Sequence, residues 1–199
     1  MSEFATYTQL GLRHILDVRA ADHLLFLIAL AAIYRYRDWR PILWVVSAFT
    51  VGHSLTLALA VTGLLTLPTA MIEFLIPVTI LATCVENLVV RDRNAAVRRR
   101  YRPLIAGIFG LMHGAGFANY LKSLFLEDVA VPILAFNVGI ELAQVVVIAA
   151  TGVAFTLADI AIRRGGGVTA DRAARFRAIV VSVAVGVVAS WWSVQRIPQ

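Results

Sequence analysis

Long runs of apolar residues restrict this chain to folds that fit a membrane. A helix that crosses the hydrocarbon layer needs roughly 20 mostly apolar residues. With 60% hydrophobic and 15% charged residues and a mean hydropathy of +0.80, the chain is too apolar for an ordinary soluble domain. We predict an all-α, polytopic membrane helix bundle that forms one transmembrane domain over residues 1–199. Its six predicted transmembrane helices cover residues 19–37, 41–63, 70–90, 103–122, 129–161 and 177–195.

The basic residues indicate how these spans are oriented. Of the 18 Lys and Arg residues, 14 lie in three alternate connections, at 34–40, 91–102 and 162–177. Because cytoplasmic loops carry an excess of Lys and Arg, we place these connections in the cytoplasm and both termini outside. The expected location is the cell inner membrane, with the lipid bilayer as partner and a homo-oligomer as an open alternative. Arginines confined between apolar runs argue against nucleic acid as a partner.

Three local features qualify this prediction. The first run has an apolar core of only ten residues, Leu24–Ile33, which is also typical of a signal peptide. We favour a span, because Asp22 and His23 interrupt the run and arginines continue after it.

The fifth run is longer than a bilayer requires and predicts a tilted or projecting helix. The single cysteine, Cys84, excludes a disulfide framework and is expected to be a packing residue.

Few polar residues lie in or beside the spans, and all four histidines of the chain are among them. An imidazole in hydrocarbon needs a protein partner, a metal or a wet cavity to satisfy its nitrogens. The concentration of histidines and carboxylates on several spans is therefore the strongest functional signal. From the predicted outer side inward, these residues are His14, Asp17, Asp22 and His23, then His53, Ser54, His113, Asn137 and Glu141, and finally Glu86 and Asn87.

Residue spacing predicts which of these groups share a helix face. A helical repeat of three or four residues places each of three sets on one face, so three helices turn a polar edge inward. Gly110 and Gly114 form a GxxxG step that allows a neighbouring helix to approach beside His113. His14 and His23 would point to opposite sides of one straight helix. Either the helix breaks near 17–21, or only one of them reaches the site. The three sets are Thr50, His53 and Ser54; Thr79, Thr83, Glu86 and Asn87; and Asn137, Glu141 and Gln144.

Each polar group also has a purely structural interpretation. A single His, Ser or Asn in a membrane helix commonly bonds to a neighbouring helix. Glu86 is close to Arg91 in sequence, which suits an interfacial ion pair, and Glu73 is expected to be solvated at an outer helix end. Glu141 is different, because a carboxylate near mid-bilayer must be protonated, paired or bound to a cation. Imidazole and carboxylate ligands without thiolates suit Zn, Ni, Fe, Co or Mn, while the same groups without a metal would relay protons.

Four segments carry ordered motifs of this kind: Gly11–Phe26, Phe49–Ala60, Phe109–Lys122 and Phe136–Gln144. They resemble the HupE/UreJ group of bacterial membrane proteins. The resemblance implies a polytopic helical protein that is an accessory of the nickel enzymes hydrogenase and urease and a nickel permease. In the HupE branch a His, five residues and Asp-His open the first span, and His-Gly followed by Glu marks a later span. Carried over by position, the resemblance implies His14, Asp22, His23, His113 and Gly114 as functional residues.

This chain departs from the HupE branch at both motifs. Seven residues separate His14 from Asp22, and Ala-Gly-Phe rather than a nearby Glu follows His113 and Gly114. The chain therefore resembles the broader second branch of the group. The resemblance identifies the family of such a chain but does not identify its substrate.

Three functions remain open. The leading hypothesis is a membrane permease or metal-handling protein for a divalent transition metal, nominally nickel, with zinc as the other expected ion. The alternative is an intramembrane metal-dependent hydrolase that acts on a lipid or a membrane peptide, with His23, His53 and His113 holding zinc and Glu141 or Asp22 as general base. The third is a structural subunit whose histidines only bond to neighbouring helices. The candidate metal ligands are His14, Asp22, His23, His53, His113 and Glu141. The candidate path or supporting residues are Asp17, Ser54, Glu86, Asn87 and Asn137.

Overall fold

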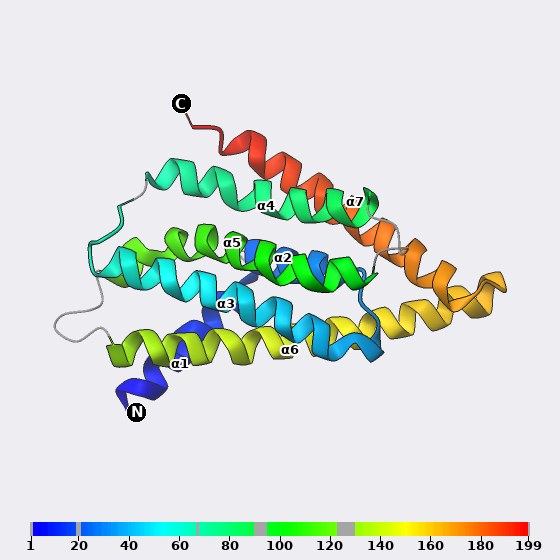
Figure 1. The fold of residues 1–199 in the computed structure, drawn as a ribbon, viewed down its shortest axis with the longest axis horizontal. Coiled ribbons are helices and arrows are strands. Elements are labelled where there is room, and N and C mark those ends of the chain that lie inside the picture. The colour runs from blue at the N-terminus through cyan, green and yellow to red at the C-terminus, as the bar shows by residue number, and fades with distance from the viewer. Residues whose placement is uncertain (1, 19–20, 67, 90–94, 123–129, 199) are drawn as a thin grey trace.

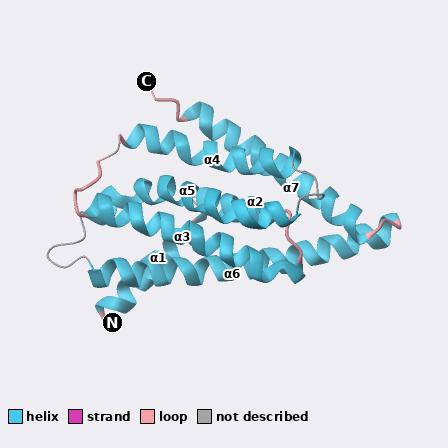
Figure 2. Cartoon of the chain, in the orientation of Figure 1, coloured by secondary structure: helices cyan, strands magenta, loops and turns pink. Residues whose placement is uncertain are grey.

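The computed structural model is helical throughout the residues that it describes, so the all-α prediction is confirmed. These residues are 2–18, 21–66, 68–89, 95–122 and 130–198, without the side chains of 95–100 and 118–122. Figures 1 and 2 show the helices packed side by side, with the N- and C-termini toward the same end of the bundle. In chain order they are α1 (Glu3–Leu16), α2 (Asp22–Ala31), the short 3-10 helix η2 (Tyr36–Asp38), α3 (Trp39–Val61), α4 (Thr69–Val89), α5 (Ala95–Lys122), α6 (Ala130–Gly166) and α7 (Ala170–Gln195).

Four of the described helices are long and apolar enough to cross a membrane: Tyr36–Val61, Thr69–Val89, Ala130–Gly166 and Ala170–Gln195. They agree with the predicted spans at 41–63, 70–90, 129–161 and 177–195. The other two predicted spans fall on α2, which has only 10 residues, and on α5, which begins inside the arginine-rich connection. The protein is thus a helical protein with four candidate membrane helices. The count of six spans is not confirmed, and the outside location of the termini stays a prediction.

The first predicted span, 19–37, is not one helix. Helix α1 ends at Leu16, Asp17 has an extended backbone with φ −70° and ψ 108°, and α2 starts at Asp22. Asp17 and Asp22 interrupt the apolar pattern here, and residues 19–20 lie outside the described residues. Of the two alternatives that the histidine spacing left open, the break near 17–21 is confirmed.

Helix α6 has 37 residues, which corresponds to about 55 Å at 1.5 Å per residue, well beyond a hydrocarbon layer of about 30 Å. Its buried residues lie between Pro132 and Val147. Figure 1 shows the second half of α6 and the start of α7 extending past the other helices. The expectation of a tilted or projecting fifth helix agrees with this length.

Glycines bring two pairs of helices into backbone contact. A Cβ atom on Gly110 would lie 2.1 Å from the carbonyl oxygen of Phe49, and one on Gly114 would lie 2.2 Å from that of His53. Helices α3 and α5 can therefore pack this closely only because both positions lack a side chain. The predicted close approach beside His113 is present, and α3 is the neighbour. Gly11 and Gly139 play the same part between α1 and α6.

Candidate metal centre

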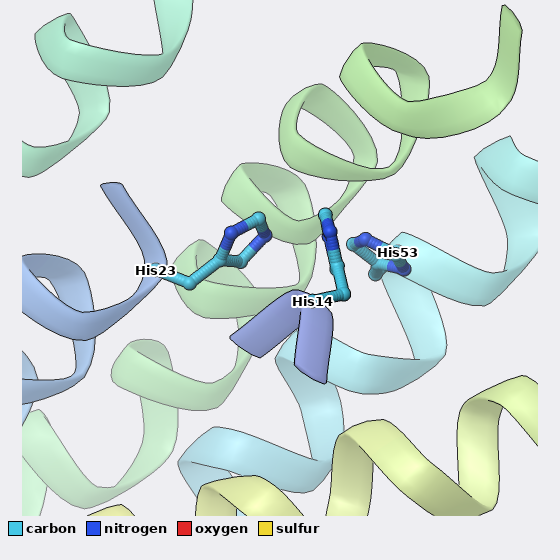
Figure 3. A group of neighbouring side chains, drawn as sticks. All are labelled: His14, His23 and His53. Atoms are coloured by element: carbon cyan, nitrogen blue, oxygen red, sulfur yellow. The ribbon is translucent and has the colours of Figure 1, made fainter. Parts of the chain in front are cut away.

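Three histidines from three helices meet inside the bundle. His14 lies in the last turn of α1, His23 in the first turn of α2, and His53 in the middle of α3. One ring nitrogen from each can be chosen so that all three lie within 4.8 Å of one another. Figure 3 shows the three rings next to one another, with His14 between His23 and His53 in this view. The break between α1 and α2 is what allows His14 and His23 to face each other.

The fourth histidine borders this group. The ring centroids of His14 and His23 are 4.6 Å apart, and each lies 5.9 Å from that of His53. The ring of His113, on α5, lies 5.1 Å from that of His23. His53 and His113 are almost fully buried, with 0% and 1% exposure. The structure thus brings together all four histidines that the sequence identified as candidate ligands.

Four ring nitrogens of the cluster have no partner within the described part of the chain. Among the described residues, nothing bonds to Nε2 of His14, Nε2 of His23 or either nitrogen of His53, and all of these atoms are buried. A buried polar atom without a partner costs free energy of folding. A bound ligand would remove this cost for these nitrogens. In a tetrahedral site with bonds of about 2.1 Å, ligand nitrogens lie about 3.4 Å apart. A shift of less than about 1 Å in each ring would meet that requirement, so the donor set fits a transition metal.

Aromatic side chains surround the cluster. The ring of Phe117 lies 4.0 Å from that of His14, and Phe26 and Phe49 lie 5.1 Å and 5.2 Å from His113, between centroids. An apolar shell of this kind limits the access of water to bound metal and strengthens its interactions with the ligands.

A cavity of about 580 Å³ borders the cluster. Its lining includes His14, His23 and His113, together with Glu73 from α4 and Arg196 from the end of α7. Two of the predicted residues, Asp17 and Asp22, also line it. Asp22 accepts a hydrogen bond from Arg196 Nη1 at 3.1 Å and does not belong to the three-histidine group.

The predicted polar edges of α3 and α6 face each other. Ser47 Oγ donates to Glu141 Oε1 at 2.6 Å, and Thr50 Oγ1 donates to Gln144 Oε1 at 2.8 Å. Glu141 is therefore paired with a hydroxyl and is not part of the three-histidine group. Asn137 Oδ1 is buried with no partner among the described residues. Ser54 Oγ donates to the carbonyl of Thr50 at 2.6 Å within α3.

Glu86 and Asn87 belong to a buried network at the other end of the bundle. Arg102, 2% exposed, donates from Nε and Nη2 to the carboxylate of Glu86 at 2.9 Å and 2.5 Å. Its Nη2 also donates to Asn87 Oδ1. Arg91, the partner that the sequence indicated for Glu86, lies outside the described residues. Both acceptors are engaged here, so they stabilise the bundle and are not open to the cavity.

Sequence reasoning missed four residues of this region. Thr79 was placed on a polar edge but not in the site, yet its Oγ1 lies 3.0 Å from His113 Nε2. Glu73 was expected to be merely solvated, and Arg196 and Arg102 were not considered as partners of carboxylates. The Thr79–Thr83–Glu86 spacing was the available signal for Thr79. No local pattern identifies the other three, because Arg196 and Arg102 bond to carboxylates on other helices and Glu73 reaches the cavity only through the packing of whole helices.

Comparison with known proteins identifies the family of this chain. No curated protein and no solved structure matches this chain. One family model, described as HupE / UreJ protein, matches residues 1–196, nearly the full length. The four motif segments with their histidines fall within that match. This chain therefore belongs to the HupE/UreJ family.

Proposed function

We propose that this protein binds a divalent transition metal at His14, His23 and His53 and passes it across the membrane, with nickel as the first ion to test. One observation carries the proposal: three imidazoles from separate helices place a nitrogen each within 4.8 Å of one another, and each ring has a buried nitrogen with no partner among the residues that the structure describes. Neutral nitrogen donors suit nickel, cobalt and zinc and discriminate against magnesium and calcium, which prefer oxygen.

The surroundings of the cluster supply a route for the ion. The cavity that carries Glu73, Asp22 and Asp17 admits a cation from the end that we assign to the outside. Beyond His53, the Ser47–Glu141 and Thr50–Gln144 pairs continue polar contacts along α3 and α6. In this scheme Glu141 is a path residue that receives the ion after the histidines.

Uptake of radiolabelled nickel into proteoliposomes tests the proposal. We expect saturable uptake by the wild-type protein, loss of binding and uptake in His53→Ala, and slower uptake with retained binding in Glu141→Gln. Thr83→Val is the matched control, because Thr83 is buried and, within the described part of the chain, its hydroxyl donates to the carbonyl of Thr79. Uptake that is unaffected by His53→Ala would refute the assignment.

A second function is an intramembrane hydrolase, favoured by the convergence of three imidazoles on one point beside a cavity with carboxylates. A bound metal would supply an activated water there, and Asp22 would have to leave Arg196 to act as a base. Metal analysis after dialysis separates the two functions. One tightly held equivalent favours the enzyme, whereas weakly held metal favours the carrier.

A further inference from the structure

The contact between His113 and Thr79 determines which nitrogen of His113 is available for a ligand. His113 lies on α5 beside the three-histidine group, and its Nε2 lies 3.0 Å from Oγ1 of Thr79 on α4. Both side chains are buried, with exposures of 1% and 6%. His113 also lines the cavity that reaches His14 and His23.

The hydrogen of the Thr79 hydroxyl is already used. Oγ1 of Thr79 lies 2.7 Å from the carbonyl oxygen of Ile76. Two oxygens at this distance need a hydrogen between them, and a carbonyl has none to give. The hydroxyl therefore donates to Ile76, and because a threonine hydroxyl has a single hydrogen, Thr79 can only accept from His113. Nε2 of His113 thus carries its hydrogen.

This assignment also determines which nitrogen of His113 carries the free electron pair. In a neutral imidazole one nitrogen carries the hydrogen and the other carries the lone pair, so the lone pair lies on Nδ1. This atom is buried and has no partner among the described residues. His113 lies outside the group of three imidazoles whose nitrogens approach within 4.8 Å of one another, but its ring centroid is 5.1 Å from that of His23. Its buried nitrogen without a partner is therefore available as a further ligand.

We propose that Nδ1 of His113 is a fourth metal-binding nitrogen of the cluster and that Thr79 is the positioning residue that keeps His113 in this form. The proposal rests on the function proposed above and specifies its ligand set. Metal-binding histidines generally donate their other ring N–H to an oxygen atom, which fixes the tautomer and the ring orientation. Thr79 supplies that oxygen. Four imidazoles with no carboxylate favour nickel, cobalt or zinc over magnesium and calcium.

Two substitutions at Thr79 test the proposal on purified full-length protein in detergent. Thr79→Val keeps the shape but removes the acceptor, whereas Thr79→Ser keeps the acceptor. We expect Thr79→Val to lower the affinity for Ni²⁺ and Zn²⁺ by 10- to 100-fold, the range seen when such supporting contacts are lost. Thr79→Ser should bind within about threefold of wild type. Thr83→Val is the control, because Thr83 lies one turn away and donates to the carbonyl of Thr79 at 2.9 Å.

The tautomer gives a second, independent measurement. Nitrogen NMR of protein labelled with ¹⁵N-histidine distinguishes protonated from unprotonated ring nitrogens. We expect His113, assigned by its loss in His113→Ala, to show a protonated Nε2 in the metal-free wild type and a mixture of tautomers in Thr79→Val. The wild-type spectrum and its assignment with His113→Ala do not require Thr79→Val, so this measurement stands even if Thr79→Val fails to fold.

Two results would overturn the proposal: a protonated Nδ1 in the wild-type spectrum, or unchanged metal affinity in Thr79→Val. Neither would refute the proposed function if His53→Ala still loses binding. If His53→Ala and wild type both fail to bind metal, the function itself is wrong.

Discussion

Gly114→Ala should disrupt the metal site by separating two helices. The added Cβ atom would lie 2.2 Å from the carbonyl oxygen of His53 and 2.9 Å from its Cα atom. Because contacts of this kind are not found below 3.0 Å, α3 and α5 must move apart by at least about 0.8 Å at His53. A metal site tolerates only about 0.2 Å of error in its ligand distances. Each ring must already shift by up to about 1 Å to reach a common ion, so a further displacement of this size at His53 places its nitrogen outside that tolerance.

We expect Gly114→Ala to cost about 1–3 kcal/mol of stability, as overpacking of a close interface does, and to weaken metal binding by at least tenfold. Thermal unfolding in detergent and competition with a chromogenic chelator measure the two effects. Gly107→Ala is the matched control on the same helix, because its Cβ would meet Ala48 at 3.4 Å, an ordinary contact. If Gly114→Ala binds metal as tightly as Gly107→Ala, close packing of α3 and α5 does not set the geometry of the cluster.

Three further changes test charged residues of the bundle, of which Arg196 lines the cavity beside the site. Glu86→Gln should destabilise the protein by about 3 kcal/mol in thermal unfolding, because it leaves the buried Arg102 without its carboxylate. Asp171→Asn, at an exposed ion pair, should cost less than about 1 kcal/mol in the same assay. Arg196→Gln should release Asp22 into the cavity and raise nickel affinity several-fold at low ionic strength, with a smaller effect at high salt. An equal effect of Glu86→Gln and Asp171→Asn, or a loss of affinity in Arg196→Gln, would contradict these assignments.

The sequence predicted the long helices well because their apolar runs are long and bounded by charged residues. The run at 70–90 corresponds to α4, Thr69–Val89, within one residue at each end. Helix α5 is different, since it begins at Ala95 within a stretch that the sequence assigned to a cytoplasmic connection. Arginine is a good helix former, so a run of arginines indicates which side of the membrane a segment lies on but not where its helix begins.

The composition of the site was predictable, whereas the pairing of its residues was not. Histidines in apolar segments can be recognised as candidate ligands from the sequence, because an imidazole in hydrocarbon needs a partner. The GxxxG step correctly indicated a close neighbour for α5. Helical periodicity placed Glu141 and Thr79 on polar edges but carries no information on which helix each edge meets. The structure places Glu141 against Ser47 and Thr79 against His113. These pairings depend on the packing of whole helices, which a local pattern does not encode.

The short helix α2 shows how arginines also hold the helix that carries His23. Ten residues make a helix of about 15 Å, so α2 ends among other helices, and its last carbonyl groups need donors there because lipid supplies none. Three side chains from α4, α5 and α7 provide them. Asn87 donates to Ala29 at 2.8 Å, Arg102 to Leu30 at 3.3 Å and Arg177 to Ala32 at 2.7 Å.

The guanidinium groups also interact favourably with the negative end of the α2 dipole. At the other end of α2, Asp22 bonds to Arg196. The helix that carries His23 is therefore fixed at both ends by charged side chains from later helices. The helix is interrupted between α1 and α2, just before His23. His23 can still be preorganised for a ligand, because residues that are distant in the sequence set its position.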